Sequence, residues 1–255
     1  MASWMIHFRI AEALLDAKAL GDAPDTDMLA AFVMGHIAPD SGVPSPDGRG
    51  YIPNKDTSHF MRSFDHGVRD RCDTCGYADE WLIPALQAGD TVAAAFHLGY
   101  LSHLVTDNAW IRAVVLPAKE TYAHLRLEDG VETPEAVARF YAFLKKDWYD
   151  RDFLYLKHHP DFPVYRVFLD TPYFGNRFLP FFPEEAFEAR RGEIAEFYRR
   201  GVESVTERET YLSEAELDGF VGDVADEILG AFGHLFSTVR WELTSYSQTG
   251  SRLMI

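Results

Sequence analysis

The chain has few cysteines and no long apolar run. Cys72 and Cys75 are the only two cysteines among 255 residues, and one C-x-x-C pair cannot build a four-thiolate metal site. We interpret both as reduced, structural thiols. No apolar stretch approaches the roughly 20 residues that span a bilayer. His7 and Arg9 also interrupt the early apolar stretch, which is unlike a signal peptide. These absences predict a soluble, cytoplasmic protein without a transmembrane segment.

Basic residues are also scarce. The chain has 24 lysines and arginines against 40 acidic residues, a net charge of −16, and no stretch gathers the basic residues into a stripe. Proteins that bind long nucleic acids neutralise phosphates with such residues. Long nucleic acid and anionic membrane surfaces are therefore disfavoured as partners, and the sequence does not indicate an oligomeric state.

Strand signals are rare, whereas helix signals are frequent. With 47% hydrophobic residues, the chain can bury a large core, and we predict an all-α, multi-helix bundle over residues 1–255 as a single domain. Long helices are expected near residues 184–206 and 213–246, where apolar positions keep bundle spacing. Residues 41–54, rich in glycine and proline, form either an active-site loop or a plain connector. Helix starts are predicted at Asp25-Thr26, Asp56-Thr57, Asp90-Thr91, Thr133-Pro134 and the Ser213 to Glu216 capping box.

The most informative pair of residues is His103 and Asp107, which lie within the apolar run of residues 96–107. At about 100° per residue the two side chains are about 40° apart on one helix face, so both can reach one ion. His97 is about 120° from His103 on the same count, which predicts a core residue and not a ligand of that ion. A buried carboxylate is costly unless it is paired or coordinated. A hydrogen-bonded pair in the core would explain the two residues equally well.

Three other segments carry similar side chains. His7 lies in the first turn of a predicted amphipathic helix, Asp40 follows the helix-ending Pro39, and His59 is expected in the first turn of a helix opened by Asp56 or Thr57. Taken singly, each is typical of a core or capping residue. In order along the chain, they form a pattern.

That pattern resembles the zinc-dependent phospholipase C family, whose all-helical fold is shared with single-strand nucleases. The matching motifs are W-x-x-H at Trp4 and His7, G-x-I-A-P-D ending at Asp40, H-F at His59, and H-x-x-x-D at His103 and Asp107. The resemblance covers the first half of the chain, and residues 160–255 look like a less recognisable C-terminal helical elaboration.

The resemblance implies a metal site. Asp40, His59, His103 and Asp107 would hold a first zinc ion, and Asp107 would bridge to a second ion bound by His7. Histidine and carboxylate ligands with an open position suit catalytic zinc, although iron or manganese would accept the same donors. The second-site cluster is incomplete, because Ala113 stands where the family has a histidine.

Two segments are candidates to complete the second site. His124 and Glu128 have the H-x-x-x-E spacing and would share one helical face, although a solvated helix end explains them equally well. The segment of residues 145–152 interleaves aspartates, among them Asp147 and Asp150, with aromatic residues. Acidic residues at helix ends are common without any metal.

The resemblance implies a metal-dependent hydrolase, a phosphoesterase that cleaves a small phosphodiester or phosphomonoester with a metal-bound hydroxide, Asp40 being the candidate base. Two alternatives stay open: a non-catalytic helical protein with a structural metal ion, and a nuclease for short single-stranded nucleic acid. A phosphohydrolase of the adjacent His-Asp type is disfavoured, because the chain has no such dipeptide.

Overall fold

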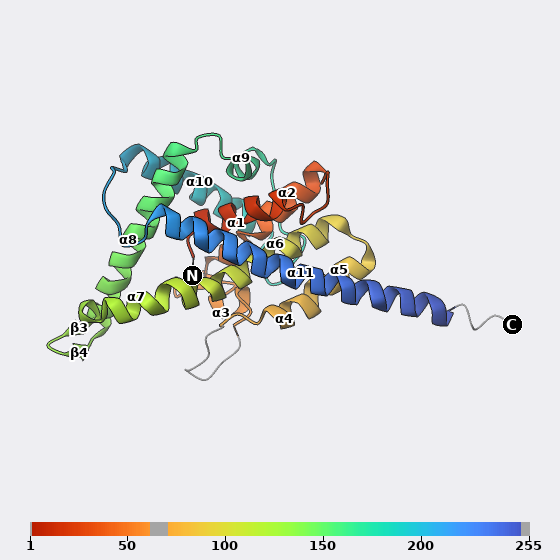
Figure 1. The fold of residues 1–255 in the computed structure, drawn as a ribbon, viewed down its shortest axis with the longest axis horizontal. Helices are drawn as coiled ribbons and strands as arrows, with labels where there is room; N and C mark the ends of the chain where they lie inside the picture. Colours follow the sequence, from red (N-terminus) through yellow and green to blue (C-terminus); the bar gives the residue numbers. More distant parts are fainter. Residues whose placement is uncertain (1, 62–70, 251–255) are drawn as a thin grey trace.

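The structure is a computed structural model that describes residues 2–61 and 71–250, the side chains of residues 238–250 excepted. It is mostly helical, which confirms the all-α prediction (Figure 1). The α-helices are α1 (Trp4–Asp16), α2 (Thr26–Gly35), α3 (Lys55–Ser58), α4 (Thr74–Tyr77), α5 (Ile83–Ala88), α6 (Thr91–Trp110), α7 (Leu116–Thr121), α8 (Pro134–His158), α9 (Pro163–Asp170), α10 (Ala186–Ser204) and α11 (Glu214–Gly250).

Short elements connect these helices. Two antiparallel hairpins pair β1 (Val43–Pro44) with β2 (Tyr51–Ile52) and β3 (Leu127–Glu128) with β4 (Val131–Glu132). The helical turns are η1 (Ala38–Asp40) and η4 (Ala123–Arg126), which are of the 3-10 type, and η2 (Ala78–Leu82) and η3 (Ile111–Val115), which are π-helical.

Side-chain caps set most of the predicted helix starts. Asp25 and Asp90 accept hydrogen bonds from the backbone N–H groups three residues on, at 2.8 and 2.9 Å, and Thr133 does the same at 3.2 Å. Ser213 and Glu216 form the reciprocal capping box at the start of α11. These four predicted starts are confirmed. The prediction at Asp56-Thr57 is wrong, because Asn54 caps the helix and α3 begins at Lys55.

Helix α6 is the centre of the bundle. Its residues from 94 to 110 are all buried, as expected for a helix that is apolar all round. Helix α2 lies directly against it because two glycines face each other's backbone. A Cβ on Gly35 would lie 2.2 Å from the Phe96 carbonyl oxygen, and a Cβ on Gly99 would lie 2.2 Å from that of Phe32. Only glycine permits this approach, which brings the end of α2 to the middle of α6.

Helices α6 and α7 are joined by η3 into one continuous helical rod, since no turn or loop separates Trp110, η3 and Leu116. A π-turn inserts one extra residue into the helical repeat. The side chains of α7 are therefore rotated about the rod axis, relative to the directions they would have in an uninterrupted α-helix.

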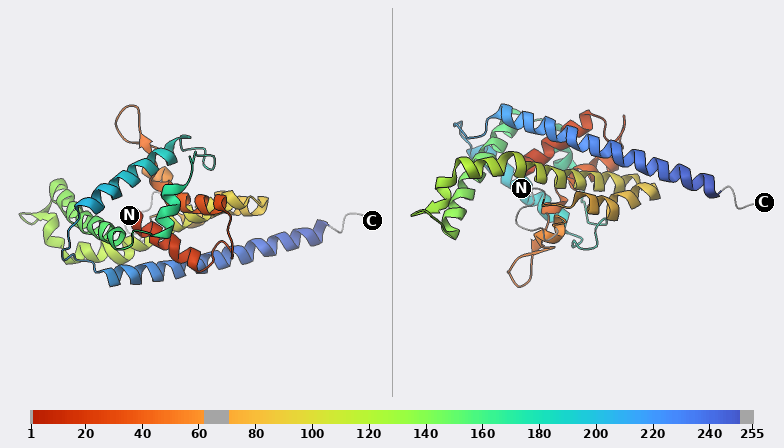
Figure 2. Two further views of the ribbon diagram at one scale, coloured as in Figure 1. Left: turned by 90° about the horizontal axis from the view of Figure 1, so that it is seen from above. Right: turned by 60° about the horizontal axis from the view of Figure 1, so that its bottom comes forward.

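The C-terminal helices pack onto the N-terminal half through one hydrophobic core. Arg9 of α1 pairs with Glu214 at 2.9 Å and with Asp218 of α11 at 2.5 Å, and Trp4 packs edge-on against Phe197 of α10. Figures 1 and 2 show α11 running along the bundle, with its C-terminal end projecting beyond the other helices. Among the described residues, no helix combines the length and apolarity needed to cross a bilayer.

Candidate metal centre

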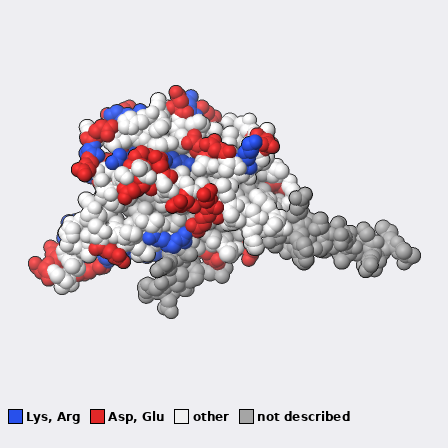
Figure 3. Space-filling model, viewed as in Figure 1, with Lys and Arg blue, Asp and Glu red and all other residues white. Residues whose placement is uncertain are grey.

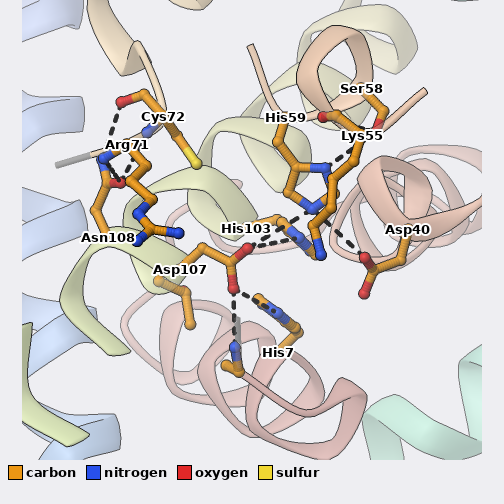
Figure 4. A network of polar contacts seen from close by, with 12 residues as sticks. His7, Asp40, Lys55, Ser58, His59, Arg71, Cys72, His103, Asp107 and Asn108 are labelled. Carbon is orange, nitrogen blue, oxygen red and sulfur yellow. Dashed lines mark hydrogen bonds and ion pairs between the residues drawn. The ribbon is translucent and has the colours of Figure 1, made fainter. Parts of the chain in front are cut away.

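Five side chains predicted as ligands converge in the structure. They come from four places in the fold: α1 supplies His7, η1 supplies Asp40, the end of α3 supplies His59, and α6 supplies His103 and Asp107 (Figure 4). They form two overlapping groups, each with ligand atoms within 4.8 Å of one another. One group is His7, His103 and Asp107, and the other is Asp40, His59 and His103.

The distances within the cluster match a coordination polyhedron better than hydrogen bonds. Nε2 of His59 lies 3.4 Å from Oδ1 of Asp40 and 3.6 Å from Oδ2 of Asp107. Nε2 atoms of His103 and His7 each lie 3.7 Å from an oxygen of Asp107. Hydrogen bonds of this type are about 2.7–3.2 Å long. Two ligands on one tetrahedral zinc ion, each about 2.0–2.2 Å from it, are about 3.3–3.6 Å apart.

Partners on the far side of two imidazole rings set their orientation. Nδ1 of His103 lies 2.7 Å from the backbone carbonyl oxygen of His36, so Nδ1 carries the proton and donates it there. Nδ1 of His59 lies 2.9 Å from Oγ of Ser58, whose own hydroxyl is directed to the Lys55 carbonyl oxygen at 3.4 Å. His103 therefore presents an Nε2 lone pair to the cluster, as metal-binding histidines with an anchored Nδ1–H do. His59 presents one in the tautomer whose Nδ1–H donates to Ser58.

The facing atoms have no hydrogen-bond partner among the described residues. Nε2 of His59 and His103, both ring nitrogens of His7 and Oδ2 of Asp107 are buried and unsatisfied. The other oxygen of Asp107 accepts from the backbone N–H of Ala2 at 2.9 Å. Because unsatisfied buried polar atoms are rare and costly, a cluster of five of them could hold a cation. A dication fits this donor set.

Electrostatics also favour cation binding. Burial lowers the pKa of His103, and burial together with the nearby His103 lowers the pKa of His7 well below its ordinary value. Both rings are therefore neutral near pH 7, as ligands must be. Burial alone would raise the pKa of Asp40, but its polar contact with His59 and the field of His103 hold that pKa far below its usual range. Trp4 Nε1 also donates to Asp40 Oδ2 at 2.9 Å.

A cavity of about 800 Å³ opens from this cluster. Asp40, His59 and Asp107 line it, so the cavity borders the buried cluster on the side of these three residues. Its walls combine aromatic and cationic side chains. These include Trp4, Tyr51, Tyr141, Trp148 and Tyr149, together with Lys55, Arg71, Lys119, Lys145 and Arg190.

Two neighbours of the cluster on α6 have other partners. His97 belongs to neither ligand group, and its Nδ1 lies 2.7 Å from the Tyr77 hydroxyl. Tyr100 stacks on Tyr77 and donates its hydroxyl to the Ser58 carbonyl oxygen, which steadies the segment that precedes His59. His59 itself follows the end of α3 and does not lie in a first turn as predicted.

The structure corrects the prediction for His124 and Glu128. They share no helical face, because the chain leaves the 3-10 turn η4 at Arg126 and enters strand β3. Both residues are exposed, and Glu128 lies 3.6 Å from Arg139. Neither belongs to the ligand groups or to the cavity wall in the described part of the chain.

Asp147 and Asp150 also lie away from the cluster. Both pair with Arg208, and Asp147 accepts a further hydrogen bond from the Tyr211 N–H at 2.8 Å. The face of α8 that lines the cavity carries Lys145, and on a helix Asp147 and Asp150 are turned about 200° and 140° from it. The segment of residues 145–152 does approach the N-terminal region through Asp152, which accepts from the Ser3 hydroxyl at 2.8 Å.

Sequence reasoning missed the residues that support the cluster. The His36 carbonyl group has no sequence signal, because any residue type could supply it. Asn108 anchors the cavity wall by accepting from the backbone N–H groups of Arg71 and Cys72, each at 2.9 Å; its place next to Asp107 was the available signal. Cys72 is a free thiol whose pKa is raised by burial, and no thiolate belongs to either ligand group.

No protein-family model, curated protein or solved structure matches the chain. The structure therefore shows a mostly helical protein with a buried histidine and aspartate cluster that could hold metal, without a family assignment.

Proposed function

We propose that this protein is a metal-dependent phosphoesterase, as the resemblance to zinc-dependent phospholipases C implies. The observation that carries the proposal is the convergence of unsatisfied ligand atoms of His59, His103 and Asp107 beside an open cavity. In this assignment Asp40, His59, His103 and Asp107 hold a first ion. His7 and Asp107 hold a second.

Dications bound there would supply Lewis acidity, lowering the pKa of a water molecule and neutralising phosphate oxygens. The protein side chains position the reacting groups. Asp107 can serve two ions, because its two oxygens face different histidines. Asp40 is ionised, and its low pKa makes it a weak proton acceptor. We therefore assign Asp40 as a ligand first and as a general base second.

The test combines metal analysis with hydrolysis of p-nitrophenyl phosphate and bis-p-nitrophenyl phosphate, before and after chelation. We expect bound zinc, iron or manganese, and turnover that chelation abolishes and the same metal restores. His103→Ala should lose both metal and turnover. His7→Ala should lose one of two ions, because only the second ion depends on this residue.

His97→Ala is the matched control, since His97 lies on the same helix but bonds to Tyr77. It should keep its metal content and turnover even if its melting temperature falls. Equal damage from His97→Ala and His103→Ala would contradict the assignment.

The second candidate is a structural ion in a non-catalytic protein. The complete burial of His7, His103 and Asp107 favours it, because structural sites exclude water. One tightly held ion, no turnover of either ester, and unfolding on chelation would support this candidate against the esterase.

A further inference from the structure

The cavity beside the cluster gathers cationic side chains that make no hydrogen bond or ion pair within the described residues. Six lysine and arginine side chains within residues 2–61 and 71–237 make no hydrogen bond or ion pair, and four of these six line the cavity. The six are Arg49, Lys55, Arg71, Lys119, Lys145 and Arg177. Acidic side chains are abundant on the face shown in Figure 3 and in the whole chain. Cations left unpaired around one cavity of such a protein indicate that their partner is an anionic ligand.

These four cations form two groups. In Figure 4, Lys55 lies between His59 and Asp40, and Arg71 lies on the side of Asp107 and Cys72. Lys119 and Lys145 lie on α7 and α8. Tyr141 connects these two elements, because its ring centroid is 5.9 Å from Nζ of Lys119 and it precedes Lys145 by one helical turn. Lys119 and Lys145 therefore form an outer cationic group, separate from the cluster.

The continuous rod of α6, η3 and α7 connects the cluster to the outer group. Asp107, Ile111, Val115 and Lys119 all line the cavity at steps of four residues. In an uninterrupted α-helix Lys119 would be turned about 120° from Asp107, whereas one residue inserted by a π-turn reduces this to about 20°. The bulge thus places a carboxylate, two apolar side chains and an ammonium group in one line along the cavity.

The distance from Asp107 to Lys119 along the rod sets the spacing between the two anionic groups of a bound molecule. One of the twelve residues is the one that the π-turn inserts, so the axial rise is that of about eleven α-helical residues, roughly 17 Å. The side chains, the ion and the two phosphates take up part of that span, which leaves on the order of 10 Å between anionic groups. Ile111 and Val115 make the intervening wall apolar.

We propose that the substrate carries a second anionic group, bound by Lys119 and Lys145, about 10 Å from the scissile phosphate and joined to it by an apolar spacer. Lys55 and Arg71 accompany the scissile phosphate. This inference rests on the proposed phosphoesterase function and specifies its substrate class. In the reaction, water oxygen bonds to phosphorus, the phosphorus–oxygen ester bond breaks, and the alcohol leaves with a proton.

The experiment compares hexyl phosphate with hexane-1,6-diol bisphosphate, which differ only in the second phosphate. Phosphate release by the metal-loaded protein should show kcat/KM for the bisphosphate at least about tenfold higher per ester bond, since a charged hydrogen-bond partner typically contributes tenfold or more. Lys119→Gln and Lys145→Gln should each lower this ratio about tenfold.

Lys146→Gln is the matched control, because it removes the same charge from the next residue of α8, which pairs with Asp150 at 2.7 Å. It should leave the ratio unchanged. Equal kcat/KM for the two esters, or a ratio that Lys146→Gln lowers as much as Lys145→Gln, would overturn the proposal.

Binding is measured in parallel through the fluorescence of Trp4 and Trp148, which line the cavity. Tighter binding of the bisphosphate that depends on Lys145, without hydrolysis of either ester or of bis-p-nitrophenyl phosphate, would support the second anionic subsite and refute the phosphoesterase. Hydrolysis of both esters, with no preference in rate or binding, would support the phosphoesterase and refute the second anionic subsite. Melting temperatures of all variants check that each is folded.

Discussion

Asp107 and Asp147 are both buried aspartates on long helices, yet their surroundings are opposite. The oxygens of Asp147 are satisfied by Arg208 and by the backbone N–H of Tyr211. Asp107 faces three histidines at 3.6 to 3.7 Å and keeps Oδ2 without a partner. The protein supplies the counter-charge for Asp147, whereas around Asp107 it supplies one backbone N–H, that of Ala2, and three imidazole rings. Burial of a carboxylate therefore says little by itself, and the nature of its neighbours distinguishes a structural ion pair from a candidate metal site.

The largest effects should come from replacing these two aspartates. Asp107→Asn should reduce metal affinity beyond the about 10- to 100-fold seen for supporting residues, while the metal-free protein keeps or gains stability because an unpaired buried charge is removed. Asp147→Asn should keep the metal and lose about 1–3 kcal/mol, since Arg208 loses one of its two charged partners. Metal analysis measures the metal content of the two variants, and urea unfolding of the chelated protein measures their stability. If both changes destabilised the metal-free protein equally, the proposed difference between Asp107 and Asp147 would be wrong.

The helix contact that positions the cluster should be the next most sensitive feature. Gly99→Ala should cost about 1–3 kcal/mol, because its Cβ would collide with the Phe32 carbonyl oxygen and push α2 away from α6. Metal affinity should fall with it, since the His36 carbonyl holds His103. Gly192→Ala in α10 is the control. Its Cβ meets nothing within 4 Å, so we expect a gain of about 0.5–1 kcal/mol. Urea unfolding of the two variants gives the answer, and a tolerated Gly99→Ala would be inconsistent with the close contact.

The response to acid gives a further prediction. Burial lowers the pKa of His7 and His103, that of His36 to about 3 and that of His97 to about 4. As pH falls below about 6.5, the unfolded chain binds protons that the folded chain does not, so stability falls. Burial raises the pKa of Asp152 to about 7, which acts in the opposite direction, but four histidines outweigh one carboxyl group. Thermal unfolding of metal-free protein between pH 7 and 4.5 should show a falling midpoint; a rising one would refute this reasoning.

Local chemistry predicted much of the fold. Asp25, Asp90, Thr133 and Ser213 are caps that act within three residues, so their helix starts were visible in the sequence. His103 and Asp107 were paired correctly on one face, because four residues of regular helix separate them. The predicted position of His59 in the first turn of a helix is wrong. Asn54 caps α3 two residues before Asp56, so the short helix has already ended when the chain reaches His59.

Long-range features could not be predicted in the same way. The π-turn η3 carries no sequence signal, so the position of Lys119 beside the cavity cannot be predicted from the sequence. The composition of residues 145–152 indicates Asp147 and Asp150 as much as Asp152. Which face of α8 meets the N-terminal region depends on the packing of distant helices, and in the structure it is Asp152 that contacts Ser3.

The anchored rings of His103 and His59 bear on how tightly the cluster could hold a metal ion. Their Nδ1 atoms are held by the His36 carbonyl group and the Ser58 hydroxyl group, so both anchors belong to the protein itself. An ion bound at the two Nε2 atoms would bear less of the entropy of ordering these rings. Groups that never touch the ion would thus contribute to its affinity through the restricted rotation of the rings that do.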